Sequence, residues 1–410
     1  MNKEDEILKI KEKNENLNDG IKILIKYKKF KKKKQIKRLE DKKEISNKSF
    51  TKLIIILVVI FLVVSLVNFI RFSTILGFKL YSKDDSMVVI ENINYEESYI
   101  DEYNKEILIV KNNEISTYNK KGDLTWNYKV LNMYNPDVYI RGNYIILSDK
   151  KTSTIYVFNG KNQISSKKIE GTILDVFVDE YGNYIVENAT TSYNKKISLF
   201  NKNSKLKEEI FLKLESIIDI QILNNAKELV ILTANTKSLN IGTDFNYINL
   251  KNKEDNIKTL YTLENEIVTN LKINNRNLIM QTNEGIKSFN IDNKNINEIY
   301  EYNDNNTSNT KLEDNYYLVI NDEEKAHYVQ TFNYEGFEVS KNLVSNIPKY
   351  ISSNKYIICL VSENSIDIYN KWGTLLKNIK IDFLPRKVII TNNSTAIALI
   401  YGNTIEIYDL

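Results

Sequence analysis

Short runs of Ile, Val, Leu, Tyr and Phe alternate with short polar runs from residue 87 to residue 410. Typical apolar runs are NYIILS (143–148), NYIVEN (183–188) and KYIICL (355–360). Runs of this length, rich in β-branched and aromatic residues and bounded by Asn, Asp, Gly and Lys, predict β-strands joined by tight turns. The same alternation excludes an array of helices, so this region is expected to be all-β.

One signature recurs along this region: an aromatic residue followed by Asn or Asp, at the end of a short strand. The anchor residues of the copies are Tyr118, Phe158, Phe200, Phe289, Phe332, Tyr369 and Tyr408. Neighbouring anchors are 37 to 43 residues apart, except for one interval of 89 residues. Leu250, within YINLKNKED, divides this long interval as a degenerate copy. We therefore expect eight repeats, whose anchors are structural and lie in the core between repeats.

Each repeat contains four runs typical of strands. In the second copy, DVYI (137–140) and NYIILS precede the anchor. In the first copy, LTWNYKV (124–130) follows the turn after the anchor. Four short strands in a period of about 40 residues are typical of a β-propeller blade. A single blade cannot bury both faces, whereas blades stacked in a ring can. The sequence predicts an eight-bladed β-propeller, or a seven-bladed one if residues 217–266 are an insertion.

The two ends of the repeat region complement each other. The last copy stops two residues after its anchor Tyr408 and so lacks its fourth strand. At the other end, MVVIEN (87–92) is typical of a strand but belongs to no repeat. We expect this segment to complete the last blade and to close the ring.

Residues 53–78 predict a transmembrane helix. Residues 53–70 contain no charged residue, and the apolar character resumes after Arg71 as far as Phe78. Such a length crosses the roughly 30 Å of a bilayer's hydrocarbon core. The preceding residues 1–52 carry 18 Lys and Arg against 9 Asp and Glu, whereas residues 53–410 carry 39 against 44. The positive-inside rule then places a basic tail (1–52) in the cytoplasm and the propeller (79–410) outside the membrane.

The basic tail permits two interpretations. Residues 21–43 mix Lys with Ile, Leu, Tyr and Phe, a composition suited to lying on anionic lipid as a helix. Alternatively, the tail is a solvated topology signal. Nucleic-acid binding is not expected of a segment tethered to a membrane.

The residues needed for several kinds of chemistry are scarce. Cys359 and His327 are the single cysteine and histidine of the chain. A structural zinc site usually takes several such ligands, and Ser-His-Asp or Cys-His catalysis would depend on His327 alone. No phosphate-binding glycine motif occurs. We therefore expect no catalytic residues, no metal and no cofactor. A chain without intramolecular disulfides also fits a bacterial envelope better than a secreted eukaryotic domain.

The repeat region resembles the quinoprotein-like β-propellers, a superfamily related in fold to the WD40 propellers. The closest local match is YNKKGDLTW, in which Gly122 and Trp126 have the spacing of that family's tryptophan-docking motif. Tyr118 stands where the family usually has Asp. In two other copies, Lys377 after Gly373 and Ser340 after Gly336 stand at the position of the tryptophan. The motif is therefore mostly lost. The layout also looks like single-pass membrane propellers of Gram-positive bacteria.

These features favour a non-enzymatic scaffold in the bacterial cell envelope. A membrane-anchored disc would bind another envelope protein or a wall polymer through the loops between its strands. Two alternatives stay open. One is a sensor that binds an external ligand, and the other is a carboxylate-based hydrolase or lyase, or a degenerate quinoprotein.

Overall fold

The computed structural model describes residues 87–410 with short gaps, together with Lys29, Lys31 and Lys33, which are helical and exposed. The gaps are residues 192–194, 212–215, 237–240, 252–256, 275, 303–309, 314–315, 324–325, 345–346 and 392–393. Apart from those three lysines, the predicted tail (1–52) and transmembrane helix (53–78) lie outside the described residues. None of the helical residues that are described belongs to a helix of membrane-spanning length and hydropathy. The described residues from 87 to 410 belong to one compact unit.

The described strands form four-stranded antiparallel sheets, which we number as blades in chain order. Blade 1 contains β2 (Ser98–Tyr103), β3 (Glu106–Lys111), β4 (Glu114–Tyr118) and β5 (Leu124–Lys129). Blade 2 contains β6 (Asp137–Arg141), β7 (Tyr144–Asp149), β8 (Thr154–Asn159) and β9 (Asn162–Lys168). Blade 3 contains β10 (Thr172–Val178), β11 (Tyr184–Ala189), β12 (Lys196–Phe200) and β13 (Leu206–Phe211). Blade 4 contains β14 (Ser216–Leu223), β15 (Glu228–Asn235), β16 (Gly242–Asn249) and β17 (Lys258–Leu263).

The second half of the unit repeats this arrangement. Blade 5 contains β18 (Val268–Asn274), β19 (Asn277–Thr282), β20 (Gly285–Asn290) and β21 (Ile296–Glu301). Blade 6 contains β22 (Thr310–Leu312), β23 (Tyr316–Glu323), β24 (Ala326–Asn333) and β25 (Glu338–Val344). Blade 7 contains β26 (Tyr350–Ser353), β27 (Ile357–Val361), β28 (Ser365–Asn370) and β29 (Leu375–Lys380). Blade 8 contains β30 (Lys387–Ile390), β31 (Ala396–Ile400), β32 (Thr404–Asp409) and β1 (Met87–Glu91), and η1 (Tyr95–Glu97) precedes β2.

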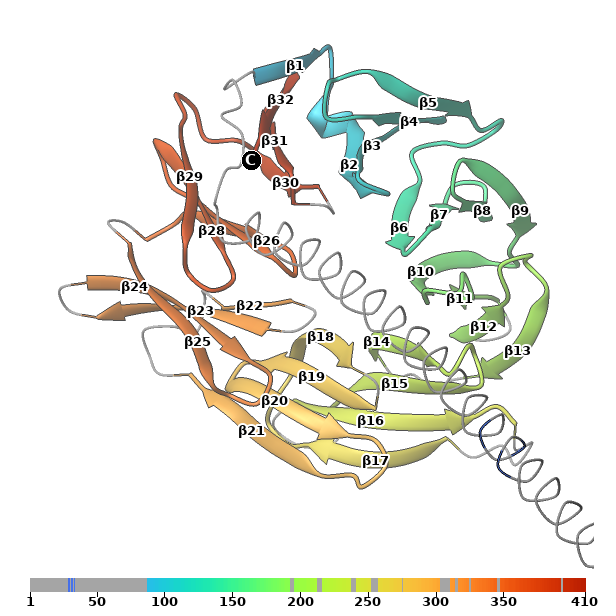
Figure 1. Ribbon diagram of the computed structural model, residues 1–410. Helices are drawn as coiled ribbons and strands as arrows, with labels where there is room; N and C mark the ends of the chain where they lie inside the picture. Colours follow the sequence, from blue (N-terminus) through green and yellow to red (C-terminus); the bar gives the residue numbers. More distant parts are fainter. Residues whose placement is uncertain are drawn as a thin grey trace, which may run out of the picture. The chain divides into compact units, whose positions relative to one another are not determined.

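The eight blades stand in a ring, with the first strand of each blade nearest the centre and the fourth at the periphery (Figure 1). The prediction of an eight-bladed β-propeller is therefore confirmed. The seven-bladed alternative is wrong, because residues 217–266 contain most of blade 4 and not an insertion. The prediction that residues 87–92 complete the last blade is also confirmed, since β1 pairs with β32.

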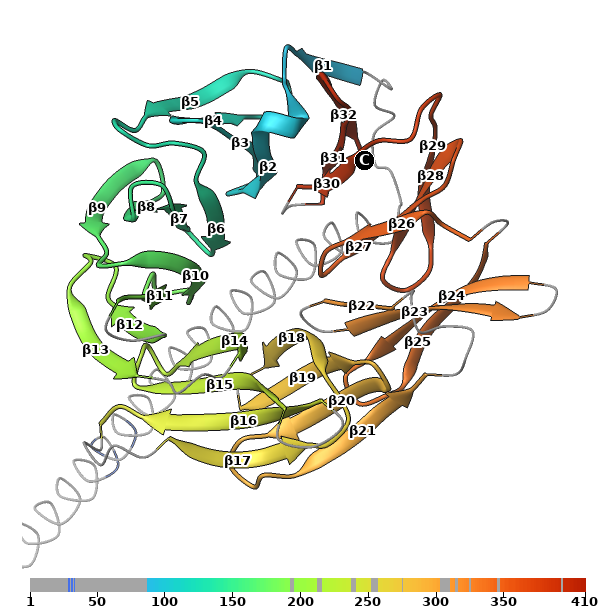
Figure 2. The same ribbon diagram turned by 180° about the vertical axis from the view of Figure 1, so that it is seen from behind.

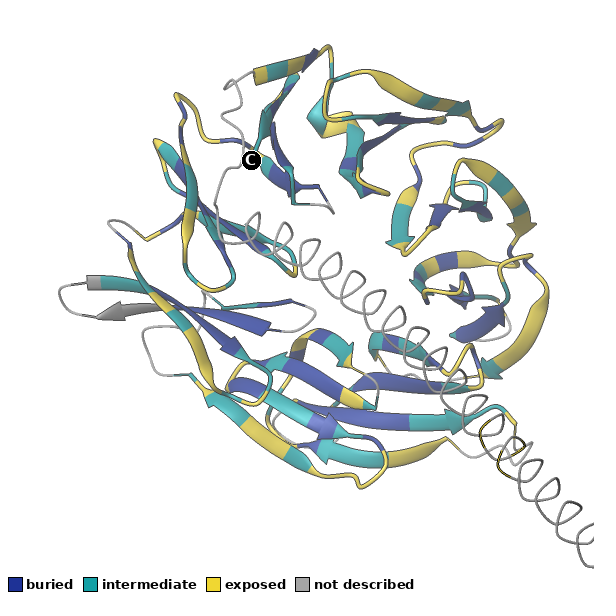
Figure 3. Ribbon diagram, viewed as in Figure 1, coloured by how far each residue is buried: buried dark blue, intermediate teal, exposed yellow. Residues whose placement is uncertain are grey.

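The core consists of eight clusters of buried apolar side chains within the described residues, and each cluster lies between two consecutive blades. Ile145 and Leu147 of β7 pack against blade 1, whereas Tyr144 and Ile146 pack against blade 3. Successive side chains of a strand point to opposite faces, so a strand covered on both faces is buried at every position. Figure 3 shows this burial in the middle strands and exposed residues along the outer strands.

Ring closure depends on β1, which lies beside β32 in both views (Figures 1 and 2). The two strands pair over five residues, from Met87 opposite Tyr408 to Glu91 opposite Thr404. Ile90 enters the cluster between blade 8 and blade 1 and is 8% exposed. This pairing therefore joins the two ends of the propeller through backbone hydrogen bonds and a shared core.

Ile90→Ala should lower the free energy of unfolding by about 3 kcal/mol, because it removes a buried side chain from the closing cluster. Val89→Ala is the matched control, since Val89 is the neighbouring residue of β1 and is 41% exposed. The control should cost less than about 1 kcal/mol. Chemical denaturation of the two variants measures the difference, and equal losses would contradict a closing role for β1.

Candidate functional site

The structure does not bring the predicted anchor residues together. They lie at or directly after the end of the third strand of each blade, one per blade around the ring: Tyr118 (β4), Phe158 (β8), Phe200 (β12), Leu250 (after β16), Phe289 (β20), Phe332 (β24), Tyr369 (β28) and Tyr408 (β32). Each is buried or half-buried and belongs to a different one of the eight clusters between blades. Their positions favour a packing role over a shared binding site.

The Asn that follows an anchor builds the next turn. Asn119 Oδ1 accepts hydrogen bonds from the backbone N–H groups of Lys121 (2.8 Å) and Asp123 (3.0 Å). The same pair of bonds recurs in three further blades, at Asn201, Asn333 and Asn370. An Asn side chain that bonds to the backbone two residues on stabilises a turn locally. The recurrence of the aromatic–Asn signature thus follows from packing and turn geometry.

Gly122 and Trp126 contact opposite neighbours of blade 1. Gly122 has a φ of +79°, and a Cβ at this position would lie 2.8 Å from Val88 Cγ1 of β1. Trp126 packs edge-to-face on Phe158, with 6.0 Å between the ring centroids. Glycine therefore lets the turn approach the preceding blade, while the indole covers the next one.

Gly122→Ala should lower the free energy of unfolding by about 1 kcal/mol more than Gly160→Ala. Both glycines have positive φ values, +79° and +60°, so both variants bear the strain of that conformation. No atom lies within 4 Å of a Cβ built on Gly160, so the difference isolates the clash with Val88. Thermal melts of both variants provide the measurement. Equal losses would show that Val88 moves aside freely.

The single histidine and cysteine lie in strands. His327 is half-buried in β24, and Cys359 is fully buried in β27. Burial raises the pKa of the Cys359 thiol to about 12, which keeps it protonated at neutral pH. No group of three or more His, Cys, Asp or Glu side chains suited to a metal occurs among the described residues.

A group of polar side chains links the inner strands of blades 2, 3 and 4. The Tyr139 hydroxyl of β6 donates to Asp175 Oδ1 of β10 at 2.8 Å, and Gln221 Nε2 donates to Asp219 Oδ2 within β14 at 3.0 Å. Burial raises the pKa of Asp219, and the charge of Asp175 adds to this, although Gln221 and Arg141 oppose it. A buried carboxyl of raised pKa near a second carboxyl is a feature of general acid–base sites and also of buried structural pairs.

Asp219→Asn should raise stability at pH 7. The pKa of this carboxyl is higher in the folded state than in the unfolded state. Its contribution to stability is therefore fully present at pH values below the unfolded pKa, and it is lost as the pH rises through the folded pKa. The gain from Asn should therefore disappear as pH falls towards 3.8, the ordinary value for Asp. Asp137→Asn, at an exposed position of β6, is the control and should show no such gain. A loss of stability at pH 7 would show that ionised Asp219 is stabilising.

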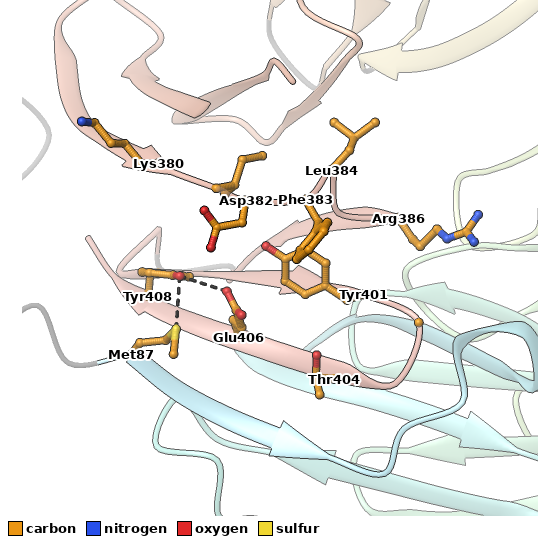
Figure 4. A pocket seen from close by; sticks show the side chains of 12 residues that line it. Met87, Lys380, Asp382, Phe383, Leu384, Arg386, Tyr401, Thr404, Glu406 and Tyr408 are labelled. Atoms are coloured by element: carbon orange, nitrogen blue, oxygen red, sulfur yellow. Dashed lines mark hydrogen bonds between the residues drawn. The ribbon is translucent and has the colours of Figure 1, made fainter. Parts of the chain in front are cut away.

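A hollow of about 590 Å³ lies against blade 8 (Figure 4). We call it the blade-8 hollow. It is lined by the end of β29, the connection to β30, the turn before β32, β32 itself and β1, through Met87, Lys380, Ile381, Asp382, Phe383, Leu384, Arg386, Tyr401, Gly402, Thr404, Glu406 and Tyr408. Volumes in this range suit small ligands or single side chains of a partner. Two segments from opposite ends of the propeller thus form one site.

Phenol and carboxylate groups face each other in this hollow. The Tyr408 hydroxyl donates to Glu406 Oε2 at 2.9 Å and lies 3.2 Å from Met87 Sδ (Figure 4). Burial raises the pKa of Tyr401 to about 12, with Glu406 and then Asp382 adding to the effect. Burial, Glu406 and Asp382 likewise raise the pKa of Tyr408. Both phenols stay neutral at pH 7, and the carboxyl groups of Glu406 and Asp382 lie close to them.

The rim of the hollow carries large exposed apolar side chains. Phe383 is 78% exposed and Leu384 is 45% exposed, both in the connection between β29 and β30. Sequence reasoning did not find this site. The one signal was the run Phe383–Leu384–Pro385 between two strands, where a polar turn is usual.

Two other hollows of comparable size occur in the described part of the chain. One, of about 640 Å³, lies among turns of blades 2, 3 and 4 and is lined mainly by amides, including Asn143, Asn183 and Asn203. The other, of about 680 Å³, lies between blades 1 and 2 beside Met133 and Tyr134. Neither combines opposed carboxylates with an exposed aromatic rim.

The fold is an eight-bladed β-propeller, the fold that the sequence resemblance implied. Residues 79–410 match the family described as "Family of unknown function (DUF5711)", and the chain belongs to this family. No curated protein matches the chain.

Three solved structures with similar folds are distant from this chain in sequence. The C-terminal WD40 domain of Sif2 is 11% identical with a TM-score of 0.50, and the WD40 domain of SCAP from fission yeast is 12% identical with a TM-score of 0.47. Each comparison covers 79% of this chain and 98% of the other. BamB from Moraxella catarrhalis is 9% identical with a TM-score of 0.45, over 79% of this chain and all of BamB. At these identities the likeness concerns the fold alone.

Proposed function

We propose that this protein is a non-enzymatic scaffold that binds another protein of the bacterial cell envelope. In this proposal residues 53–78 cross the membrane once, the basic tail lies in the cytoplasm, and the propeller lies outside. The tail's lysines would rest on anionic lipid of the inner leaflet. The proposed orientation rests on the charge difference between the tail and the rest of the chain.

The observation that carries this proposal is the exposed apolar rim of the blade-8 hollow. Phe383 and Leu384 project from a connection whose flanking residues Ile381 and Pro385 are buried. The loop is therefore attached to the ring on both sides of its exposed tip. A fixed loop with large exposed apolar side chains next to a hollow has the features of a protein-binding site, because binding buries apolar area without ordering the loop.

The two alternatives predict different ligands. A sensor would bind a small molecule and pass a change to the tail. A hydrolase or lyase would act on a polymer through carboxylates, and the raised pKa of Asp219 beside Asp175 is the observation in its favour. Neither alternative accounts for exposed Phe383 and Leu384, which a catalytic or small-molecule site in the inner strands does not use.

Photo-cross-linking in cells tests the scaffold. A photoreactive phenylalanine analogue at position 383 of the full-length protein should cross-link to one discrete partner protein. The same analogue at position 337 is the matched control, because Phe337 is 67% exposed on blade 6, outside the blade-8 hollow. The double variant Phe383→Ser, Leu384→Ser should lose co-purification of that partner at least about tenfold. Equal cross-linking from both positions, or adducts to wall polymer alone, would contradict the proposal.

A further inference from the structure

We propose that the blade-8 hollow binds the guanidinium group of an arginine side chain supplied by the partner protein. This inference rests on the proposed scaffold function and names the chemical group that its site recognises. The argument uses the charges of the hollow, its aromatic lining and the directions of its own cationic side chains.

Two carboxylates, those of Asp382 and Glu406, line the hollow together with the cationic side chains of Lys380 and Arg386. Figure 4 shows the carboxylates of Asp382 and Glu406 near the Tyr401 and Tyr408 rings. Asp382 is exposed on the connection after β29 and Glu406 is half-buried on β32, so the two charges come from different elements. Both carboxylates line the same hollow as the two phenols. Two carboxylates in one hollow are stabilised by a cation between them.

The cationic side chains that line the hollow are directed elsewhere. In Figure 4 the ends of Lys380 and Arg386 point away from Glu406. One terminal nitrogen of Arg386 lies 3.9 Å from Glu96 Oε1 of η1, on the side of blade 1. The hollow's own cations thus leave the space between Asp382 and Glu406 to a cation from another molecule.

The other lining groups favour arginine over lysine. Phe383 and Tyr401 line the hollow with aromatic rings, and Met87 adds a polarisable thioether. A guanidinium is planar, less strongly hydrated than an ammonium, and able to donate to a carboxylate while stacking on an aromatic ring. An extended partner segment that buries Phe383 and Leu384 would place such a side chain beside Glu406. The apolar rim then supplies contact area, and the carboxylates supply selectivity.

Methionine methyl groups offer a direct test in the full-length protein. The chain has four methionines, and Met87 lines the hollow while Met133 and Met280 are buried elsewhere, at 3% and 0% exposure. Titration of ¹³C-methyl-methionine protein with N-acetyl-arginine amide should shift the Met87 signal to saturation and leave the Met133 and Met280 signals unmoved. The citrulline amide has the same shape without the charge and should have no effect. The lysine amide should bind more weakly.

Asp382→Asn and Glu406→Gln should each weaken arginine amide binding about tenfold, as expected for the loss of one charge-assisted contact. Asp137→Asn is the matched control, because Asp137 lies on blade 2, outside the hollow. Unchanged Met133 and Met280 signals show that a variant is folded. Because Asp382 lies in an exposed connection, its substitution should affect folding least.

The outcomes separate this inference from the scaffold function. If Met87 does not respond to arginine amide, or responds equally to citrulline amide, the arginine site is wrong even where position 383 still cross-links to a partner. Equal affinity for the lysine amide would overturn the choice of arginine. A selective Met87 response without any cross-linked partner would support the site and contradict the scaffold.

Discussion

The antiparallel pairing of β1 with β32 is the contact on which the propeller depends. Each blade buries both of its faces, so a row of blades is stable only when the first and the last cover each other. The Tyr408 hydroxyl lies beside Met87 at a sequence separation of 321 residues, and the cluster that includes Ile90 lies between blades 8 and 1. Bringing such distant segments together costs chain entropy, which the pairing and the shared core must offset. In this fold the loss of the closing contact therefore has a larger effect than the loss of one of the other seven interfaces between blades.

The repeat signature follows from the same requirement. The third strand of a blade must place one large side chain in the interface and then turn sharply, so an aromatic residue is followed by Asn. Asn119 shows how the amide holds the turn, and Gly122 shows how the turn comes within contact distance of the outer strand β1. Lys377 replaces the docking tryptophan in blade 7, yet Gly373 keeps a φ of +85° beside Ser340 and Asn342 of blade 6. The turn is therefore retained where the indole contact is lost, because backbone geometry allows fewer residue types than an apolar interface does.

Much of the architecture could be predicted from the sequence, because strand periodicity and the 40-residue spacing reflect burial on two faces. The strands with the weakest sequence signal are the short inner strands β22 (Thr310–Leu312) and β26 (Tyr350–Ser353). TKL and YISS are too short and too polar to show an alternating pattern, and they pair only because adjacent strands hold them in register. Apart from the apolar run Phe383–Leu384–Pro385, the sequence carries no sign of the blade-8 hollow. The hollow combines Met87 with Glu406 and Tyr408, and only ring closure brings these residues together.

Closure and recognition are thereby linked through the same residues. Met87 and Tyr408 form one end of the β1–β32 pairing and also line the blade-8 hollow. A partner that contacts both Met87 and Tyr408 in this hollow touches both ends of the propeller, so it binds the closed ring more tightly than an open one. Binding to one state alone stabilises that state by mass action, in proportion to the logarithm of the ligand concentration over its dissociation constant. Because Met87 lines the hollow only when β1 is paired with β32, a partner that contacts Met87 contributes to the stability of the fold that presents the site.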